Sequence, residues 1–167
     1  KLLEAVNPRS KIYPDALAYL DWLEADTKVR EATQAYSQAF GKRAFQLLSE
    51  AYACRSLGAD AKQSISVRRT HWSRVVKSYE RGMTRSHDGD KLEALSELKR
   101  VLELEQDPHN RYRARAKSEI ETIEAQLVEQ LKRHLQSGLA ALLQGARRGH
   151  LHTALAAIVL IGQRRDG

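Results

Sequence analysis

Residues 72–108 hold two helix-like patterns joined by a short polar turn, and this segment constrains the fold more than any other. Four apolar residues of the first pattern share one helix face, because their spacings are four, three and four: Trp72, Val76, Tyr79 and Met83. After Gly89-Asp90, small and large apolar residues recur at helical spacing: Ala94, Leu98 and Val101. Pro108 closes the segment. We therefore predict a helical hairpin, which must pack on neighbours to bury its apolar face.

The rest of the composition also favours an all-α chain. The 167 residues are 42% hydrophobic and 29% charged, an ordinary balance for one globular domain. From Ala16 onward good helix formers predominate, and the three prolines lie near the edges of predicted helices. We therefore expect an all-α fold in which antiparallel helical hairpins stack as an irregular solenoid or bundle.

Caps and breaks divide the chain into about seven predicted helices within one domain. Residues 1–13 are predicted to be irregular, 14–58 to form the N-terminal helices, and 67–167 to hold the hairpin, a long helix and a C-terminal helix, with a polar linker at 59–66. Asp26 or Thr27 is expected to cap a second helix, and Gly145 to end the long one. The predicted core stripe of the long helix is Ile120, Ile123, Leu127, Leu131, Leu135, Leu139 and Leu142.

The charge is basic and uneven, with a formal net charge of +7 and a pI near 9.7. Four cations lie opposite the apolar stripe of the first hairpin helix: Arg74, Lys77, Arg81 and Arg85. Further basic residues, among them Arg111 and Arg115, start the long helix, whereas residues 93–107 are acidic. The cationic stripe has two interpretations. It is either a solvated outer face with no binding role or a surface that binds an anionic partner.

Residues 72–108 resemble one unit of the tetratricopeptide repeat family. The match is strongest at Ala94, Leu98 and Val101 after the Gly89-Asp90 turn, with Gly82 where the family places a small residue for close helix packing. Arg85 departs from the family, which usually has an aromatic residue there. The four-then-three spacing recurs at Ala44, Leu48 and Ala51 and at Ala154, Ile158 and Ile161, although at intervals of 50 and 60 residues rather than the family's 34. A generic helical bundle is the alternative.

The resemblance implies a protein-binding module whose first helices line a concave groove. In this chain the corresponding groove residues are Val76, Tyr79, Met83 and Ser86. The same first helix supplies the core stripe, so how much of each side chain is exposed stays open.

Motifs for catalysis and for metal binding fail when their spacing is checked. His150 and His152 are two residues apart, so on a helix they point to different faces. Asp88-Gly89-Asp90 starts like a calcium loop, but Glu93 and Lys99 stand where glycine and glutamate are required. No glycine-rich phosphate loop and no catalytic signature occurs. We expect no catalytic residues, no metal and no cofactor, and hence no enzyme.

These observations favour a non-enzymatic scaffold or adaptor within a larger assembly. The expected partner is a protein, as a peptide segment or a neighbouring subunit, and the basic surface predicts that this partner is acidic. The predicted partner-binding residues are Arg74, Lys77, Arg81, Arg85, Val76, Tyr79, Met83, Ser86, Arg111 and Arg115. Nucleic-acid binding by the basic helices is the alternative, and a helical accessory domain of an enzyme is a third. The apolar run 154–161 is expected to be buried or to support a homo-oligomer.

The compartment is predicted from cysteine usage and hydropathy. Cys54 is the single cysteine, so an internal disulfide is impossible and a reducing, cytoplasmic location is the simpler interpretation. The eight-residue run 154–161 is too short for a membrane span, which needs about 20 residues. Since the chain starts at Lys1 without methionine, we expect a piece of a longer protein.

Overall fold

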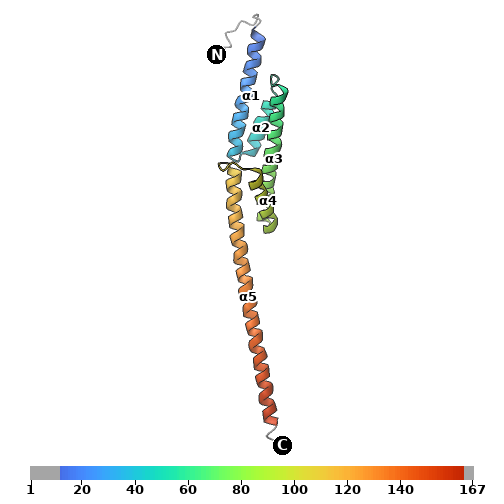
Figure 1. Cartoon of the computed structure of the whole chain (residues 1–167), viewed down its shortest axis with the longest axis vertical. Helices are drawn as coiled ribbons and strands as arrows, with labels where there is room; N and C mark the ends of the chain where they lie inside the picture. Colours follow the sequence, from blue (N-terminus) through green and yellow to red (C-terminus); the bar gives the residue numbers. More distant parts are fainter. Residues whose placement is uncertain (1–11, 164–167) are drawn as a thin grey trace. The chain divides into compact units, whose positions relative to one another are not determined.

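The computed structural model describes the backbone of residues 12–163 and the side chains of 12–145 and 148–149. This part of the chain forms five helices and no strand, which confirms the all-α prediction: α1 (Tyr13–Ser37), α2 (Gly41–Tyr52), α3 (Ala59–His87), α4 (Lys91–Leu104) and α5 (Arg111–Gln163) (Figure 1). The chain divides into two compact units, Lys1–Ile123 and Glu124–Gly167, and each is described separately below.

The prediction of about seven helices is wrong for the described residues, because two predicted breaks do not interrupt a helix. The Thr27 hydroxyl donates to the Leu23 carbonyl at 2.9 Å, so it is satisfied within α1 and caps nothing. Asp26 forms an ion pair with Arg30 one turn later, at 2.7 Å. Gly145 lies inside α5, so the predicted long and C-terminal helices are one. A single glycine weakens a helix without ending it.

The predicted linker at 59–66 is also helical and forms the first two turns of α3. Gly58 is its N-cap residue with extended backbone, and Asp60 lies in the first turn, where a negative charge is favourable. Ile65 is buried, so these polar turns still contribute one residue to the core. The boundary between the N-terminal helices and the hairpin is therefore the segment 53–58.

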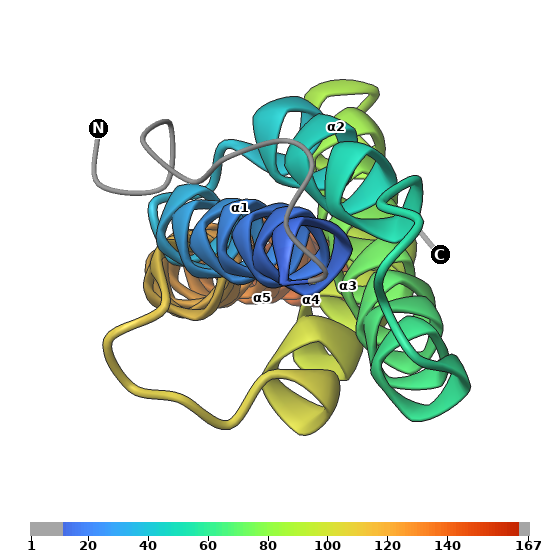
Figure 2. The same cartoon turned by 90° about the horizontal axis from the view of Figure 1, so that it is seen from above.

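The first unit is built from two antiparallel helical hairpins. α1 packs along α2, and α3 packs along α4, while α2 also contacts α3 (Figures 1 and 2). The second helices contribute the same small–large–small set to the core, all without exposed surface: Ala44, Leu48, Ala51, Ala94, Leu98 and Val101. Helix lengths do not support the predicted tetratricopeptide-like solenoid, since α1 and α3 have 25 and 29 residues but α2 and α4 only 12 and 14.

Gly82 has the packing role that its position predicts. A Cβ added at Gly82 would lie 2.7 Å from Leu98 Cγ, which is closer than van der Waals contact allows. The absent side chain therefore lets α3 and α4 approach each other. Gly89 has a left-handed backbone with φ of 86°, which glycine adopts without strain, and Asp90 then caps α4 by accepting a bond from the Glu93 N–H.

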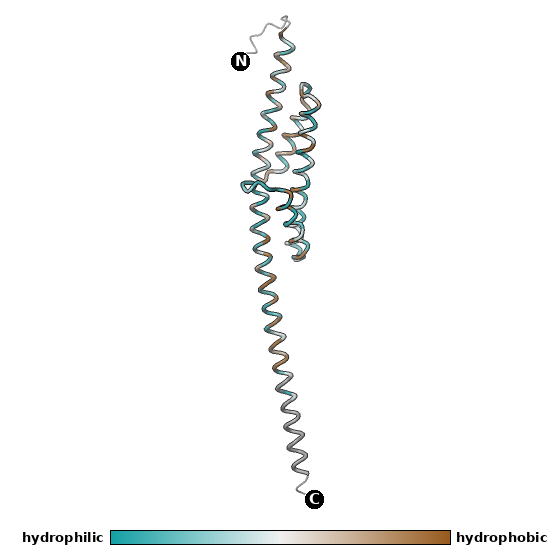
Figure 3. The backbone as a smooth tube through the Cα atoms, viewed as in Figure 1, coloured by the Kyte–Doolittle hydropathy of each residue, from teal (hydrophilic) through white to brown (hydrophobic). Residues whose placement is uncertain are grey.

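The predicted core stripe of α5 is correct only for its first members. Ile120 and Ile123 are buried, but Leu131, Leu135, Leu139 and Leu142 are exposed. Figure 3 shows hydrophobic positions recurring along this helix. Periodicity identified the stripe, but whether another surface covers it is not a local property. The predicted burial of 154–161 concerns side chains outside the described residues.

Among the described residues, no helix combines the length and the hydropathy needed to cross a bilayer.

Candidate functional site

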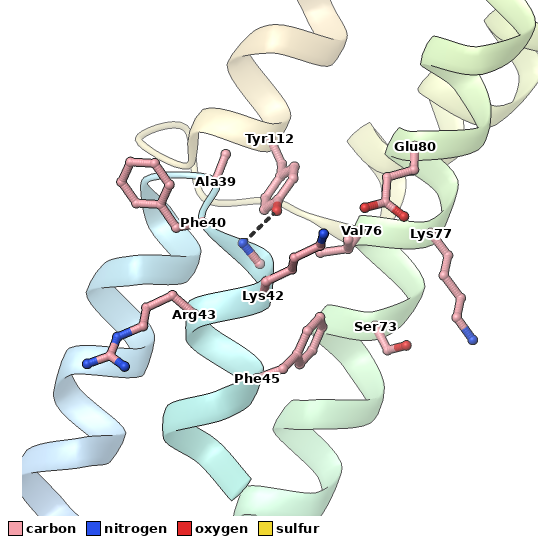
Figure 4. Close-up of a pocket in the computed structure, with 11 residues that line it drawn as sticks. Ala39, Phe40, Lys42, Arg43, Phe45, Ser73, Val76, Lys77, Glu80 and Tyr112 are labelled. Atoms are coloured by element: carbon pink, nitrogen blue, oxygen red, sulfur yellow. Dashed lines mark hydrogen bonds between the residues drawn. The ribbon is translucent and has the colours of Figure 1, made fainter. Parts of the chain in front are cut away.

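A pocket of about 540 Å³ lies between the start of α2, the middle of α3 and the first turn of α5 (Figure 4). Its apolar lining comes from Phe40, Phe45 and Val76, and Tyr112 reaches into it. Phe40 is 61% exposed, because it sits in the turn between α1 and α2. The pocket therefore presents aromatic surface to solvent.

One hydrogen bond across the chain defines the floor of this pocket. The Gly41 N–H donates to the Tyr112 hydroxyl at 3.0 Å, which joins the first turn of α2 to the first turn of α5. A Cβ at position 41 would lie 2.6 Å from that hydroxyl and 3.2 Å from Val76, so only glycine allows this approach. No acceptor for the hydroxyl's own hydrogen is found among the described residues, and Figure 4 shows the hydroxyl facing the pocket.

A buried polar network holds Tyr112 in place. Asn110 caps α5 by accepting a bond from the Tyr112 N–H at 2.9 Å, and its side-chain amide donates to Glu105 at 3.1 Å. The same Glu105 oxygen accepts a 2.7 Å bond from the Tyr36 hydroxyl of α1, and the Asp107 N–H donates to the other oxygen. Glu105 and Asn110 are both buried, so each needs these partners.

Burial favours the neutral form of both tyrosine hydroxyls. It raises the pKa of Tyr36 well above its usual range, and the adjacent Glu105 carboxylate raises it further. Burial also raises the pKa of Tyr112, against the opposing effect of the Gly41 hydrogen bond. Tyr112 is a hydrogen-bond donor at physiological pH, as a tyrosine with the ordinary pKa of about 10 would also be. A carbonyl or carboxylate oxygen that entered the pocket would find this donor ready.

Cations surround the pocket, and no ion pair neutralises them within the described part of the chain. Lys42 and Arg43 lie on the first turn of α2 and Lys77 on α3, with Glu80 as the single acid of the lining. Arg74 is one turn before Lys77 and is also exposed and without an ion pair there. The first turn of α2 adds the partial positive charge of a helix N-terminus. The rim of the pocket is therefore net positive.

The predicted cationic stripe of α3 is exposed, but its two halves differ. Arg81 lies 3.9 Å from Glu97, and Arg85 lies 3.1 Å from Glu93 and 3.7 Å from Asp90 of the α3–α4 turn. Acidic residues of α4 and of the turn before it thus form ion pairs with the C-terminal half of the stripe, Arg81 and Arg85. Arg74 and Lys77 have no such partner in the described residues, so the half of the stripe without ion pairs is the one that includes the pocket residue Lys77. Arg111 and Arg115 are exposed on α5 and do not line it.

The predicted groove residues of α3 lie partly against α5. Tyr79 packs edge to face on Tyr112 at 5.3 Å between ring centroids. The Ser86 hydroxyl donates to Glu119 at 2.7 Å, and Val76 is buried at the pocket floor. Met83 is half-buried. The first turns of α5 therefore occupy much of the face that the resemblance assigns to a partner, and partner binding by these four residues stays a prediction.

Sequence reasoning missed most of the pocket lining. Phe40, Phe45, Lys42, Arg43 and Tyr112 were not predicted as site residues, whereas Val76 and Lys77 were. A local signal did exist at Phe40-Gly41-Lys42-Arg43, where two cations follow an aromatic residue and a glycine at a helix start. The part that no local signal supplies is Tyr112, which meets Gly41 from 71 residues away.

The described residues give little support to metal binding or to thiol chemistry. They contain no group of three or more His, Cys, Asp and Glu side chains placed to hold a metal ion. Burial raises the pKa of the Cys54 thiol, which disfavours its reactive thiolate form.

Comparison with known proteins identifies no relative. No protein-family model matches the chain, no curated protein matches it, and no solved structure matches it. The resemblance to tetratricopeptide repeats therefore stays a prediction.

Proposed function

We propose that this chain is a non-enzymatic scaffold that docks an acidic segment of a partner protein in the pocket beside Gly41 and Tyr112. The observation that carries the proposal is the combination of an open apolar pocket with uncompensated cations on its rim. An apolar side chain of the partner would fill the space between Phe40, Phe45 and Val76. Most binding energy at protein interfaces comes from a few such anchors.

The rim supports recognition of charge around that anchor. Lys42, Arg43 and Lys77 can attract carboxylates on either side of the apolar residue, which mainly speeds association and selects the partner. The free hydrogen of the Tyr112 hydroxyl can donate to a backbone carbonyl or to a carboxylate of the docked segment. Arg74, Arg81, Arg85, Arg111 and Arg115 would add a wider positive field without direct contact in the pocket.

Peptide display on the whole chain tests this proposal. We expect selection from a random library to enrich peptides with one large apolar residue flanked by Asp or Glu. Enriched peptides should bind a Lys42→Glu/Lys77→Glu variant at least about tenfold more weakly, because two attractive charges become repulsive. Arg55→Glu/Lys117→Glu is the matched control, since it changes the same net charge at exposed sites outside the pocket. Equal losses of peptide affinity in both variants, or no enrichment of such peptides, would refute the proposal that the pocket binds the partner.

Nucleic-acid binding is the second candidate, and the exposed basic residues of α3 and α5 are the observation that favours it. The ion pairs of Arg81 and Arg85 with α4 weigh against it, because they reduce the charge available to phosphates. A labelled single-stranded RNA separates the two functions. Affinity that falls steeply with salt and is equally reduced in both double variants would favour nucleic acid.

A further inference from the structure

The leucine-rich face of α5 between residues 127 and 143 is exposed to solvent in the single chain. Six of its members expose more than half of their surface, namely Val128, Leu131, Leu135, Leu139, Leu142 and Leu143. Leu127 is half-buried. At about 100° per residue these side chains gather on one side of the helix. Contiguous apolar surface of this extent is rare on a monomer and marks an interaction site.

The helix itself gives a second reason to expect a partner. Residues 124–145 belong to the second compact unit, where α5 is the only element described. In proteins most of a helix's stability comes from the packing of its apolar face, and Gly138 and Gly145 weaken this helix when it is unpacked. Burial of the apolar face against another surface would supply the missing stabilisation.

The arrangement of the stripe shows which surface fits it. Its members are symmetric about Leu135: Leu127 and Leu143 lie eight residues away on either side, Val128 and Leu142 seven, and Leu131 and Leu139 four. A second copy that runs antiparallel and crosses at Leu135 therefore places every apolar member opposite another apolar member. A two-fold symmetric interface requires this kind of self-complementarity, in which residue i meets residue j and j meets i.

The charges of this segment agree with the same pairing. Residues 125–145 carry only three formal charges, although the whole chain has a net charge of +7. The symmetric crossing places Glu129 opposite Ala141, Lys132 opposite Gly138 and Arg133 opposite Ser137, so no like charges meet. Glu129 and Arg133 are already paired with each other at 3.2 Å. Two copies can thus approach along this face without the repulsion that the net charge would otherwise cause.

We propose that two copies of this chain dimerise through antiparallel pairing of their α5 helices, centred on Leu135. The proposal is independent of the pocket beside Tyr112 and concerns a different surface from the run 154–161.

Sedimentation equilibrium of the 167-residue chain over a wide range of concentration tests the dimer. Wild-type protein should shift from the mass of one chain to the mass of two. Leu131→Glu should raise the dissociation constant at least about a hundredfold, because each dimer then buries two carboxylates against leucine and loses two apolar contacts. Gln130→Glu is the matched control, since it adds the same charge at an exposed neighbour off the stripe, and it should change the constant less than about threefold.

The double variant Leu131→Glu/Leu139→Lys separates antiparallel from parallel pairing. In the antiparallel dimer each new carboxylate faces the new amine of the other copy, so association should recover at least about tenfold relative to Leu131→Glu alone. In a parallel dimer like charges would face each other at both positions, and association would not recover. Circular dichroism confirms that each variant keeps its helices. A wild-type chain that stays monomeric, a control as weak as Leu131→Glu, or a double variant without recovery would each overturn the proposal.

Discussion

The two hairpins of the first unit, α1–α2 and α3–α4, have the same internal design but different neighbours. Fifty residues separate equivalent positions, so Ala32 corresponds to Gly82 and Leu48 to Leu98. Both turns close with the same backbone bonds, from Phe40 N to Ala35 O at 2.8 Å and from Asp90 N to Arg85 O at 2.9 Å. The two turns therefore share the same backbone geometry.

The hairpins differ where they meet other elements. Trp72 of α3 is 6% exposed and its ring stacks on Tyr36 of the first hairpin at 4.2 Å, whereas its counterpart Trp22 is 44% exposed. The counterpart of Tyr36 is Ser86, which bonds to Glu119 of α5. The same position thus supports a buried aromatic stack in one case and a half-buried polar contact in the other. Neighbours, and not the hairpin pattern, decide the energy of each residue.

Replacement of each tryptophan by alanine should reveal the largest difference in stability between the two hairpins. We expect Trp72→Ala to lower the free energy of unfolding by about 3–5 kcal/mol, because it removes a buried ring and leaves a cavity. Trp22→Ala should cost roughly 1 kcal/mol, since much of that side chain is already in water. Urea unfolding followed by circular dichroism measures both. Similar losses for the two variants would mean that Trp22 is covered in solution and that the hairpins are more alike than described.

Removal of the Tyr36 hydroxyl should have the next largest effect. Tyr36→Phe keeps the stack on Trp72 but leaves the buried Glu105 carboxylate without one donor, and we expect a loss of about 1–3 kcal/mol. Ser86→Ala at the equivalent position should cost about 0.5–1 kcal/mol, because its bond to Glu119 is only half-buried. Urea midpoints at neutral pH give both values. A loss for Ser86→Ala that equals the loss for Tyr36→Phe would show that burial of Glu105 adds nothing.

Tyr36→Phe should also flatten the alkaline part of the plot of unfolding free energy against pH. Since burial and Glu105 raise the pKa of Tyr36 in the folded state, the phenol ionises more readily in the unfolded chain. Its contribution is fully present below the unfolded pKa of about 10 and is lost as pH rises above that value. Thermal unfolding from pH 8 to 11 in wild type and Tyr36→Phe measures the difference. Part of the slope should remain in the variant, because the pKa of Tyr112 is raised as well.

Sequence reasoning succeeded where the information is local and failed where it is not. The buried positions Leu48 and Leu98 follow from helical periodicity, which short-range geometry determines, whereas the small residue at 82 was expected from the resemblance to the repeat family. Helix ends were predicted less well, because Thr27 can satisfy its hydroxyl within a helix as easily as at a cap. The pocket depends on the bond between Gly41 and Tyr112 across the chain, and no periodic pattern encodes such a contact.

The turns of the two hairpins offer the smallest and most symmetric test. Ala39 and Gly89 occupy the same place after α1 and α3, and both have left-handed backbone, with φ of 63° and 86°. Glycine adopts this conformation freely, whereas alanine is strained there. Gly89→Ala should therefore destabilise the chain by about 1 kcal/mol. Ala39→Gly should stabilise it by about 0.5 kcal/mol, because relief of strain is partly offset by the entropy of glycine in the unfolded chain.

Differential scanning calorimetry of the two single variants and their combination resolves these opposite shifts. A Cβ at Gly89 meets no atom within 4 Å, so steric contact cannot explain a loss there and backbone conformation is the remaining cause. The two effects should add, since the turns lie in different hairpins and share no hydrogen bond. If Ala39→Gly instead lowers the melting temperature, the first turn must gain more from the alanine side chain than it loses in strain, and the two hairpins would differ within their turns as well as at their outer faces.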